Sequence, residues 1–175
     1  CSKEDTVARA VRAQKMGMRI MINFHYSDSW ADPAKQNKPL AWANHTVAQL
    51  KQDVYNHTWE VLTALKQAGV TPEWVQVGNE TNDGMLWPTG RASTNMSGFA
   101  QMINAGYDAV KAVFPQAKVI VHLANGYDNS LFRWMFDGLK SNGAKYDVIG
   151  MSLYPTWANS TWQVANQNCL NNNLP

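Results

Sequence analysis

The feature of this sequence that most constrains its fold is a fourfold alternation of longer amphipathic segments with short apolar ones. Each apolar segment is six or seven residues long and rich in Val, Ile or Met, which is typical of strands buried in a parallel sheet. Each longer segment places apolar residues three and four positions apart, which predicts a helix. Strands that alternate with such helices indicate right-handed crossovers between parallel strands. The predicted strands span 18–24, 73–78, 118–123 and 147–153, and the predicted helices span 2–16, 44–68, 96–114 and 129–139.

Two α/β architectures fit this alternation, a doubly wound open sheet and a stretch of a (β/α)8 TIM barrel. The periodicity of the segments does not choose between them. A doubly wound fold commonly carries a glycine-rich phosphate-binding turn after an early strand, and the sequence contains neither Gly-x-Gly-x-x-Gly nor Gly-x-x-x-x-Gly-Lys-Ser/Thr. The residues that follow the predicted strands favour the barrel.

The composition describes an ordinary globular chain and excludes several classes of protein. With 175 residues, of which 45% are hydrophobic, the chain is long enough for one domain with a real core. A net charge of +2 without a long basic run gives no electrostatic footprint for nucleic acid or for an anionic membrane. No stretch approaches the roughly 18 apolar residues that a membrane span requires. Eight tryptophans and six tyrosines are more than a plain core of this size usually uses, which favours a ligand that stacks on aromatic rings.

Polar and aromatic residues follow the end of every predicted strand. They occupy positions 25–28, 79–80, 125–128 and 154–157. In a parallel barrel these strand ends converge on one rim, where the active site lies. Glu80 is the leading candidate, because a protonated carboxyl group at such a rim can donate its proton to a glycosidic oxygen. The alternative for an Asn-Glu pair is a surface or helix N-terminal carboxylate, but the position at a strand end favours catalysis.

Tryptophans close to these strand ends fit the same kind of ligand. Trp30, Trp87 and Trp157 each fall within a few residues of a strand end. Their flat apolar faces can stack on the C–H faces of sugar rings. Bracing of a long loop is the equally favoured alternative for each of them.

The sequence gives no pattern for a metal or a cofactor. Cys1 and Cys169 lie at opposite ends of the chain without a metal-type spacing, so both a disulfide and two free thiols stay open. His25 and His122 lie near the ends of different strands, with no third ligand in a pattern such as His-Glu-x-x-His. We expect these histidines to donate hydrogen bonds to sugar hydroxyls or to satisfy the barrel rim, with no metal and no cofactor.

Three strings of the sequence resemble arabinogalactan endo-β-1,4-galactanases, glycoside hydrolase family 53, in clan A of the retaining glycoside hydrolases. They cover residues 24–33, 75–80 and 147–155, in the family's order and with suitable spacing. The resemblance spans nearly the whole chain, up to the region of Trp157. It implies a (β/α)8 barrel, of which this chain supplies roughly strands three to six with their helices. It also implies cleavage of internal β-1,4 bonds of galactan through a covalent galactosyl-enzyme intermediate.

The resemblance assigns roles to individual residues. By motif, Glu80 is the general acid/base after the fourth barrel strand, and Asn79 hydrogen-bonds the 2-hydroxyl of the sugar at the cleavage point. Tyr154, after the sixth strand, orients the nucleophile. The remaining residues that the resemblance places along the cleft are His25, Asp28 and Trp87.

The sequence covers only part of the barrel that the family implies, from before the third strand to soon after the sixth. A retaining mechanism needs a second carboxylate about 5–5.5 Å from the first, and the family supplies it from the end of the seventh strand. The glutamates other than Glu80 fall in predicted helices or at the start of a strand, at Glu4, Glu60 and Glu73. We therefore expect the nucleophile to lie outside this sequence. We also expect residues 1–175 to form a single partial barrel domain, incomplete at both ends, that does not hydrolyse substrate alone.

Two other functions stay open. Another clan A glycanase, a mannanase or a glucanase, is possible because Asn-Glu after a barrel strand is shared across the clan. A non-catalytic glycan-binding barrel would keep the aromatic residues but lack the pair of carboxyl groups. The expected partner is a β-1,4-galactan polysaccharide or oligosaccharide bound by a monomer. Because such a polymer is too large to cross a membrane, we expect a secreted or cell-surface protein, although the first residues lack the apolar centre of a signal peptide.

Overall fold

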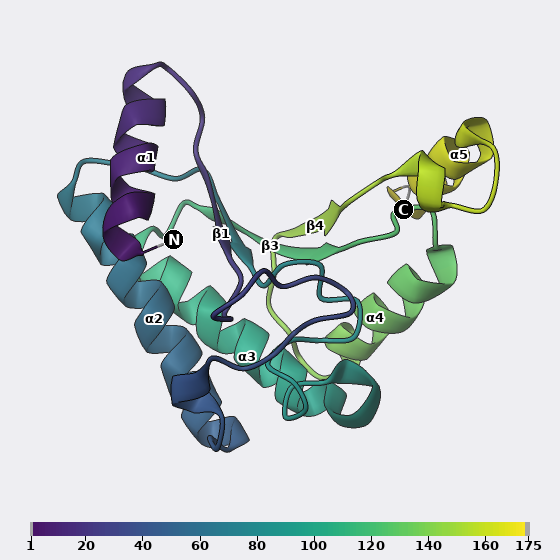
Figure 1. Cartoon of the computed structure of the whole chain (residues 1–175), viewed down its shortest axis with the longest axis horizontal. Helices are drawn as coiled ribbons and strands as arrows, with labels where there is room; N and C mark the ends of the chain where they lie inside the picture. The colour runs from purple at the N-terminus through teal and green to yellow at the C-terminus, as the bar shows by residue number, and fades with distance from the viewer. Residues whose placement is uncertain (1, 174–175) are drawn as a thin grey trace.

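The structure, a computed structural model, describes residues 2–173. Its centre is a four-stranded parallel sheet with the strands in chain order, β1-β2-β3-β4 (Figure 1). The strands are β1 (Met21–Phe24), β2 (Trp74–Val77), β3 (Lys118–Leu123) and β4 (Val148–Met151). The α-helices are α1 (Lys3–Lys15), α2 (Val47–Gln67), α3 (Ala92–Val113), α4 (Asn129–Ser141) and α5 (Trp162–Asn173), and the 3-10 helices are η1 (Leu40–Trp42) and η2 (Pro155–Trp157).

The strand order and the placement of the helices distinguish the two candidate architectures. A doubly wound sheet reverses its strand order at a switch point and carries helices on both faces. In this chain every strand pairs with the next one along the sequence, and α2, α3 and α4 lie along the same side of the sheet (Figure 1). The predicted α/β fold, a part of a (β/α)8 barrel, is therefore confirmed over the doubly wound alternative.

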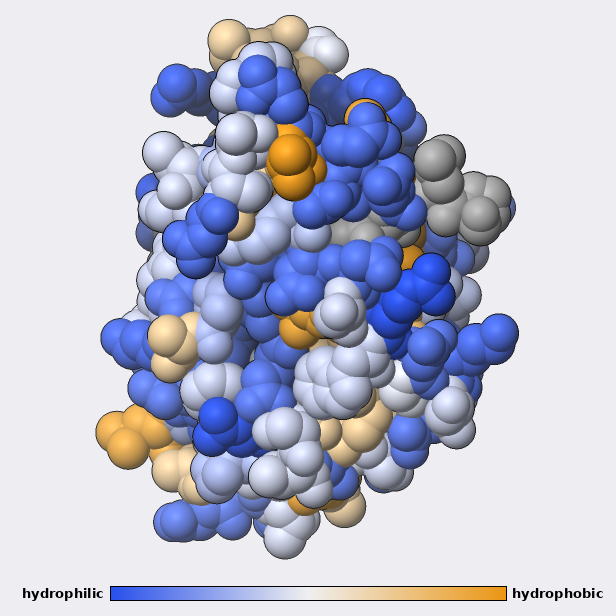
Figure 2. Space-filling view, turned by 90° about the vertical axis from the view of Figure 1, so that its right-hand side faces the viewer, coloured by the Kyte–Doolittle hydropathy of each residue, from blue (hydrophilic) through white to orange (hydrophobic). Residues whose placement is uncertain are grey.

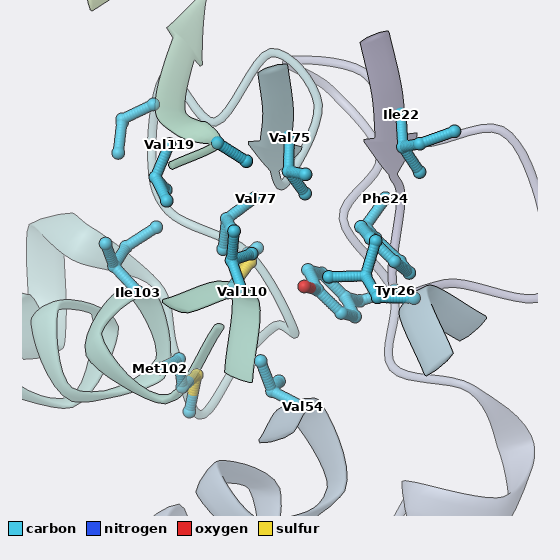
Figure 3. Close-up of a cluster of buried hydrophobic side chains, with 14 of the residues drawn as sticks. Ile22, Phe24, Tyr26, Val54, Val75, Val77, Met102, Ile103, Val110 and Val119 are labelled. Carbon is cyan, nitrogen blue, oxygen red and sulfur yellow. The ribbon is translucent and has the colours of Figure 1, made fainter. Parts of the chain in front are cut away.

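The two faces of the sheet differ in chemistry. Ile22, Val75 and Val119 are partners in the strand register and point into an apolar layer beneath α2 and α3 (Figure 3). Since successive side chains of a strand alternate between faces, the neighbouring positions face the other way. Asn23 and Gln76 occupy such positions and are joined by a hydrogen bond of 2.7 Å from Gln76 Nε2 to Asn23 Oδ1. This polar face corresponds to the interior of the barrel.

The helices begin and end where their local sequence requires. Ser2 and Asp5 form a capping box at the start of α1, and Thr46 and Gln49 form another at the start of α2. Gly69 follows α2 with φ of 77°, a left-handed conformation in which glycine carries no steric penalty. These ends agree with the predicted helices 2–16 and 44–68 to within a few residues.

Two features of the helices differ from the predictions. Helix α3 begins at Ala92, four residues before the predicted start, and is kinked at Asn95, whose φ and ψ are −154° and 64°. Helix α5 is not predicted from the sequence, because its many asparagines and glutamines give no apolar stripe.

The face of the molecule shown in Figure 2 is predominantly polar. On the side that carries α4 and α5, apolar residues stand singly or in small groups among polar ones (Figure 2). Within residues 2–173, no helix is both long enough and apolar enough to cross a membrane. Cys1, one of the two cysteines of the disulfide alternative, lies outside the described residues; Cys169 lies in α5 with its thiol 3.9 Å from the sulfur of Met151.

Candidate active site

Glu80 lies in a tight left-handed turn directly after β2. Gly78 has φ of 84° and Glu80 has φ of 48°. A side chain at position 78 would bring its Cβ within 2.7 Å of Thr81 Cγ2, so the turn requires glycine there. A non-glycine residue in the left-handed region costs on the order of 1–3 kcal/mol, and such strain persists only where the surroundings hold the backbone in place.

Hydrogen bonds from two other segments hold this turn. The backbone N–H of Glu80 donates to Nδ1 of His122 at 3.2 Å, and the N–H of Thr81 donates to the carbonyl oxygen of His122 at 2.8 Å. On the other side, Nε2 of Gln36 donates to the carbonyl oxygens of Asn79 at 2.7 Å and Glu80 at 3.3 Å. Gln36 is 1% exposed and Thr81 is fully buried. The backbone of Glu80 is therefore fixed by contacts with β3 and with the loop that follows β1.

Asn79 lies in a network of amide side chains on the polar face of the sheet. Its Oδ1 accepts hydrogen bonds from Asn23 Nδ2 at 3.0 Å and from Gln76 Nε2 at 3.2 Å. Its Nδ2 donates to the carbonyl oxygen of Ala31 at 2.8 Å. These contacts fix the orientation of the Asn79 amide and leave its Nδ2 with a second N–H to donate.

Burial favours the neutral form of the two histidines nearest to Glu80. Burial lowers the pKa of His25 and of His122, and the nearby Glu80 carboxylate opposes this effect more weakly in both. Nδ1 of His25 accepts a hydrogen bond of 3.1 Å from the N–H of Ala31, which places the ring proton of the neutral form on Nε2. The ring of Trp30, which is 71% exposed, lies 4.6 Å from the His25 ring. Nε2 of His25 lies 3.3 Å from Nδ2 of Asn23, so the ring joins the loop after β1 to the amide network around Asn79.

Asp28 and Tyr154 lie at the ends of the outer strands. Asp28 is exposed, and its Oδ2 accepts a hydrogen bond of 2.7 Å from the N–H of Leu40, which anchors the loop after β1. Tyr154 is 51% exposed, and its ring lies 4.7 Å from that of Trp157, which is 66% exposed. This pair presents an aromatic surface beyond β4.

Trp87 belongs to the loop that follows Glu80, and its position is fixed by that loop. Its Nε1 donates to the carbonyl oxygen of Asp83 at 2.8 Å, and the Arg91 guanidinium lies 4.4 Å from the ring centroid. The Asp83 carboxylate in turn binds Arg91 Nε at 2.6 Å and the N–H of Ser93 at 2.7 Å. Although burial raises the pKa of Asp83, these bonds hold it below its ordinary value. Arg91 covers one face of the indole.

A cavity of about 750 Å³ lies beside β1, but it is not the site built around Glu80. Residues of α1, β1 and the following loop line it, among them His25, Asp28 and Trp30. Glu80 is not among its lining residues. The cavity lies along the edge of β1 that has no partner strand within the described residues. We therefore assign the candidate site to the rim around Glu80.

Several other carboxylates of the described residues are engaged elsewhere. Glu73 pairs with Arg19 at 2.5 Å at the start of β2, and Glu60 pairs with Lys3 on the helical side. Asp128 caps α4 by accepting the N–H of Leu131. In residues 2–173 no group of three or more histidine, cysteine or acidic side chains could hold a metal ion. Within the described chain, the rim thus offers the Glu80 carboxyl without an internal ion pair.

Comparison with known proteins decides which family this geometry represents. The model of glycosyl hydrolase family 53 matches residues 1–174. The chain belongs to glycosyl hydrolase family 53. An arabinogalactan endo-β-1,4-galactanase of Thermothelomyces thermophilus is 34% identical over 172 residues, which are 95% of this chain and 51% of that protein. One of Cellvibrio japonicus is 39% identical over 156 residues, which are 84% of this chain and 41% of that protein.

Solved structures of family 53 share the fold. The catalytic domain from Ignisphaera aggregans superposes with a TM-score of 0.85 at 41% identity, over 90% of this chain and 43% of that one. A structure from a study of two fungal β-1,4-galactanases superposes with a TM-score of 0.88 at 32% identity, over 95% of this chain and 52% of that one. This family 53 chain spans about half the length of the relatives that it matches.

Sequence reasoning alone missed the residues that hold the family 53 site together. Gln36, Asn23 and Gln76 carry most of the amide network around Asn79 and Glu80. Gln36 lies 43 positions from Asn79 in a loop without periodicity. Asn23 and Gln76 give a weak signal, because a polar side chain inside an apolar strand needs a partner.

Gln36→Leu is expected to destabilise the turn that carries Glu80. The change keeps the side-chain volume but leaves the buried carbonyl oxygen of Asn79 without a donor, at a cost of about 1–3 kcal/mol, whereas the Glu80 carbonyl oxygen keeps the N–H of Asn82 at 2.9 Å. Urea unfolding of the full-length protein measures the loss. Gln52→Leu, on the exposed face of α2, is the matched control and should change the free energy of unfolding by less than about 0.5 kcal/mol. Equal stabilities of the two variants would contradict a clamping role for Gln36.

The free energy of unfolding is expected to fall as the pH decreases from about 6.5. Because burial lowers the pKa of His25 and of His122, the unfolded chain takes up protons at a higher pH than the folded chain. Above the pKa that a histidine has in the unfolded chain, both states are neutral and the fold has its full stability. As the pH falls from that value to the lower pKa of the folded chain, only the unfolded chain gains protons, so the free energy of unfolding decreases. Urea unfolding at a series of pH values measures the slope. His25→Asn, which keeps an acceptor near Nδ1 but does not titrate, should reduce it, and an unchanged slope would refute this origin.

Proposed function

We propose that the protein carrying this chain hydrolyses internal β-1,4-galactosidic bonds of galactan, including type I arabinogalactan, with retention of configuration. The observation that supports this most directly is the position of Glu80 in a chain of family 53. Glu80 follows β2 at the carboxyl rim of the sheet, and hydrogen bonds from His122 and Gln36 hold the backbone there. The names of the relatives from Thermothelomyces thermophilus and Cellvibrio japonicus support β-1,4-galactan as the substrate.

Glu80 serves as acid in the first step and as base in the second. The protonated carboxyl of Glu80 gives its proton to the glycosidic oxygen. At the same time a carboxylate nucleophile, from a part of the protein outside residues 1–175, attacks the anomeric carbon. The bond to the leaving sugar breaks, and a covalent galactosyl-enzyme forms. Glu80, now ionised, takes a proton from water, which attacks the same carbon and releases the nucleophile. Two inversions give net retention, with the two carboxyl groups about 5–5.5 Å apart.

The neighbours of Glu80 bind and orient the sugar in this proposal. The second N–H of the Asn79 amide donates to the 2-hydroxyl of the sugar at the cleavage point, and Nε2 of His25 donates to another hydroxyl. Tyr154 orients the nucleophile, and the free face of Trp87 stacks on a sugar ring. Asp28 lines the cleft through the loop that it anchors.

The proposal extends to the organisation of the protein. Residues 1–175 form one partial catalytic barrel domain, whose remaining strands complete the rim. We propose a monomer that acts outside the cell or at its surface, because a polysaccharide is too large to enter. Light scattering coupled to size-exclusion chromatography of the full-length protein measures its mass, and a stable dimer would refute the monomer.

Substrate profiling of the full-length protein tests the proposed function. We expect it to release oligosaccharides from β-1,4-galactan and to leave β-mannan and cellulose intact. Release from mannan or cellulose without attack on galactan would establish a different clan A glycanase. Binding of galactan without any release of oligosaccharides would establish a glycan-binding barrel instead.

A further inference from the structure

The backbone of Glu80 depends on one side chain of the neighbouring strand. His122 lies on β3, opposite Gly150 of β4, and its Nδ1 accepts the N–H of Glu80 at 3.2 Å. The carbonyl oxygen of the same histidine accepts both the N–H and the hydroxyl of Thr81, at 2.8 and 3.1 Å. One residue therefore contacts the turn at Glu80 through its ring and through its backbone.

The contacts of the His122 ring select one tautomer. Because Nδ1 accepts a hydrogen bond from a backbone N–H, it must carry a lone pair, and the proton of the neutral ring lies on Nε2. Nε2 is 2.8 Å from the hydroxyl oxygen of Ser152, which then accepts this proton. A ring with its proton on Nδ1, or a doubly protonated ring, would set two N–H groups against each other at Glu80.

The surroundings of the His122 ring favour its neutral form. Burial lowers the pKa of His122, and the His25 ring beyond the end of β1 acts in the same direction. The Glu80 carboxylate acts against them. The strand on the other side presents the neutral Ser152 and Gly150. The ring is thus held as an acceptor toward Glu80 and as a donor toward Ser152.

We infer that His122 is a positioning residue for the acid/base, held in its Nε2–H tautomer by the backbone N–H of Glu80, with the hydroxyl of Ser152 accepting the Nε2 proton. The inference rests on the proposed function of Glu80. His122 does not touch the substrate in this arrangement. It fixes the left-handed backbone from which the Glu80 carboxyl approaches the glycosidic oxygen, so its loss impairs proton transfer to the leaving sugar. Misplacement of a catalytic group by about 1 Å can cost on the order of 10²-fold in rate.

A comparison of two substrates separates this role from a purely structural one. Galactan has a leaving sugar that needs a proton, whereas an aryl β-galactobioside with a good leaving group does not. In the full-length protein, His122→Phe should lower kcat/KM for galactan by about 10-fold or more, and should lower it for the aryl substrate by less than about 3-fold. The ratio of the two losses does not depend on the folded fraction of the variant.

Two further variants examine the hydrogen bonds themselves. Asn at position 122 places Oδ1 near the position of Nδ1, so His122→Asn should restore most of the loss on galactan. Ser152→Ala removes the acceptor of Nε2–H, loosens the orientation of the ring, and should give a smaller loss that is again specific to galactan. His57→Phe, on α2 behind the sheet, is the control for the histidine-to-phenylalanine change and should leave both activities unchanged.

Each outcome decides between the alternatives. A selective loss in His122→Phe with rescue in His122→Asn supports the positioning role, and if His122→Phe fails to fold, a selective loss in Ser152→Ala supports it. Equal losses on the two substrates in His122→Phe, or full activity of Ser152→Ala on galactan, would overturn it. A parental protein that hydrolyses neither substrate would instead overturn the proposed function, and the inference with it.

Discussion

Glu80→Gln is expected to lower kcat/KM of the full-length protein for β-1,4-galactan by about 10²-fold or more, with little change in folding or in galactan affinity. The amide is close in size to the carboxyl group but cannot donate a proton to the glycosidic oxygen, and general acid catalysis contributes about 10²–10⁴-fold. Because the backbone of Glu80 is held by His122 and Gln36, the turn should persist in the variant. Reducing-end release from galactan measures the effect.

The matched control for this variant is Glu73→Gln, at the other end of β2. Glu73 pairs with Arg19 on the surface, far from the carboxyl rim, so its variant should retain the parental rate. Aryl galactosides with good leaving groups should suffer a smaller loss from Glu80→Gln than galactan does. Parental hydrolysis of galactan by Glu80→Gln would exclude Glu80 as the acid.

Phe99→Ala is expected to lower the free energy of unfolding by about 3–5 kcal/mol. Phe99 lies on α3, is fully buried, and belongs to the main apolar cluster of the described residues. Its truncation removes an aromatic ring from this cluster and leaves a cavity. Urea unfolding of the full-length protein measures the shift of the midpoint.

The control for Phe99→Ala is Leu40→Ala, whose side chain is 83% exposed in the loop before α2. That change should alter the free energy of unfolding by less than about 0.5 kcal/mol. A loss below about 1 kcal/mol in Phe99→Ala would mean that the apolar cluster around Phe99 does not carry the stability assigned to it.

The strands could be predicted closely because their signal is local. Strand β3 occupies the predicted residues 118–123 without change. The predicted strand 73–78 is longer than β2, because Gly78 already adopts the positive φ of the turn to Glu80. Helix α3 begins earlier than predicted because Asp83 accepts the N–H of Ser93, which stabilises a helix start that the periodicity of the sequence does not mark.

The candidate site could be predicted only in part. Asn79 and Glu80 were identifiable because they end an apolar strand, and parallel strands bring their carboxyl ends together. The roles of Gln36 and His122 could not be predicted, since they depend on contacts across 44 and 42 positions of the sequence. Such contacts are determined by the register of the strands and by the path of the loops, which residue patterns do not encode.

The most direct test of Glu80 as the acid/base of a retaining mechanism uses Glu80→Ala in the full-length protein with an activated aryl β-galactobioside and added azide. The good leaving group lets the galactosyl-enzyme form without an acid, but water cannot attack it efficiently without a base. Azide needs no base, so it should accelerate turnover and give the β-galactobiosyl azide, identified by its anomeric NMR signal. No acceleration by azide, or formation of the α-azide, which would make Glu80 the nucleophile, would contradict this role.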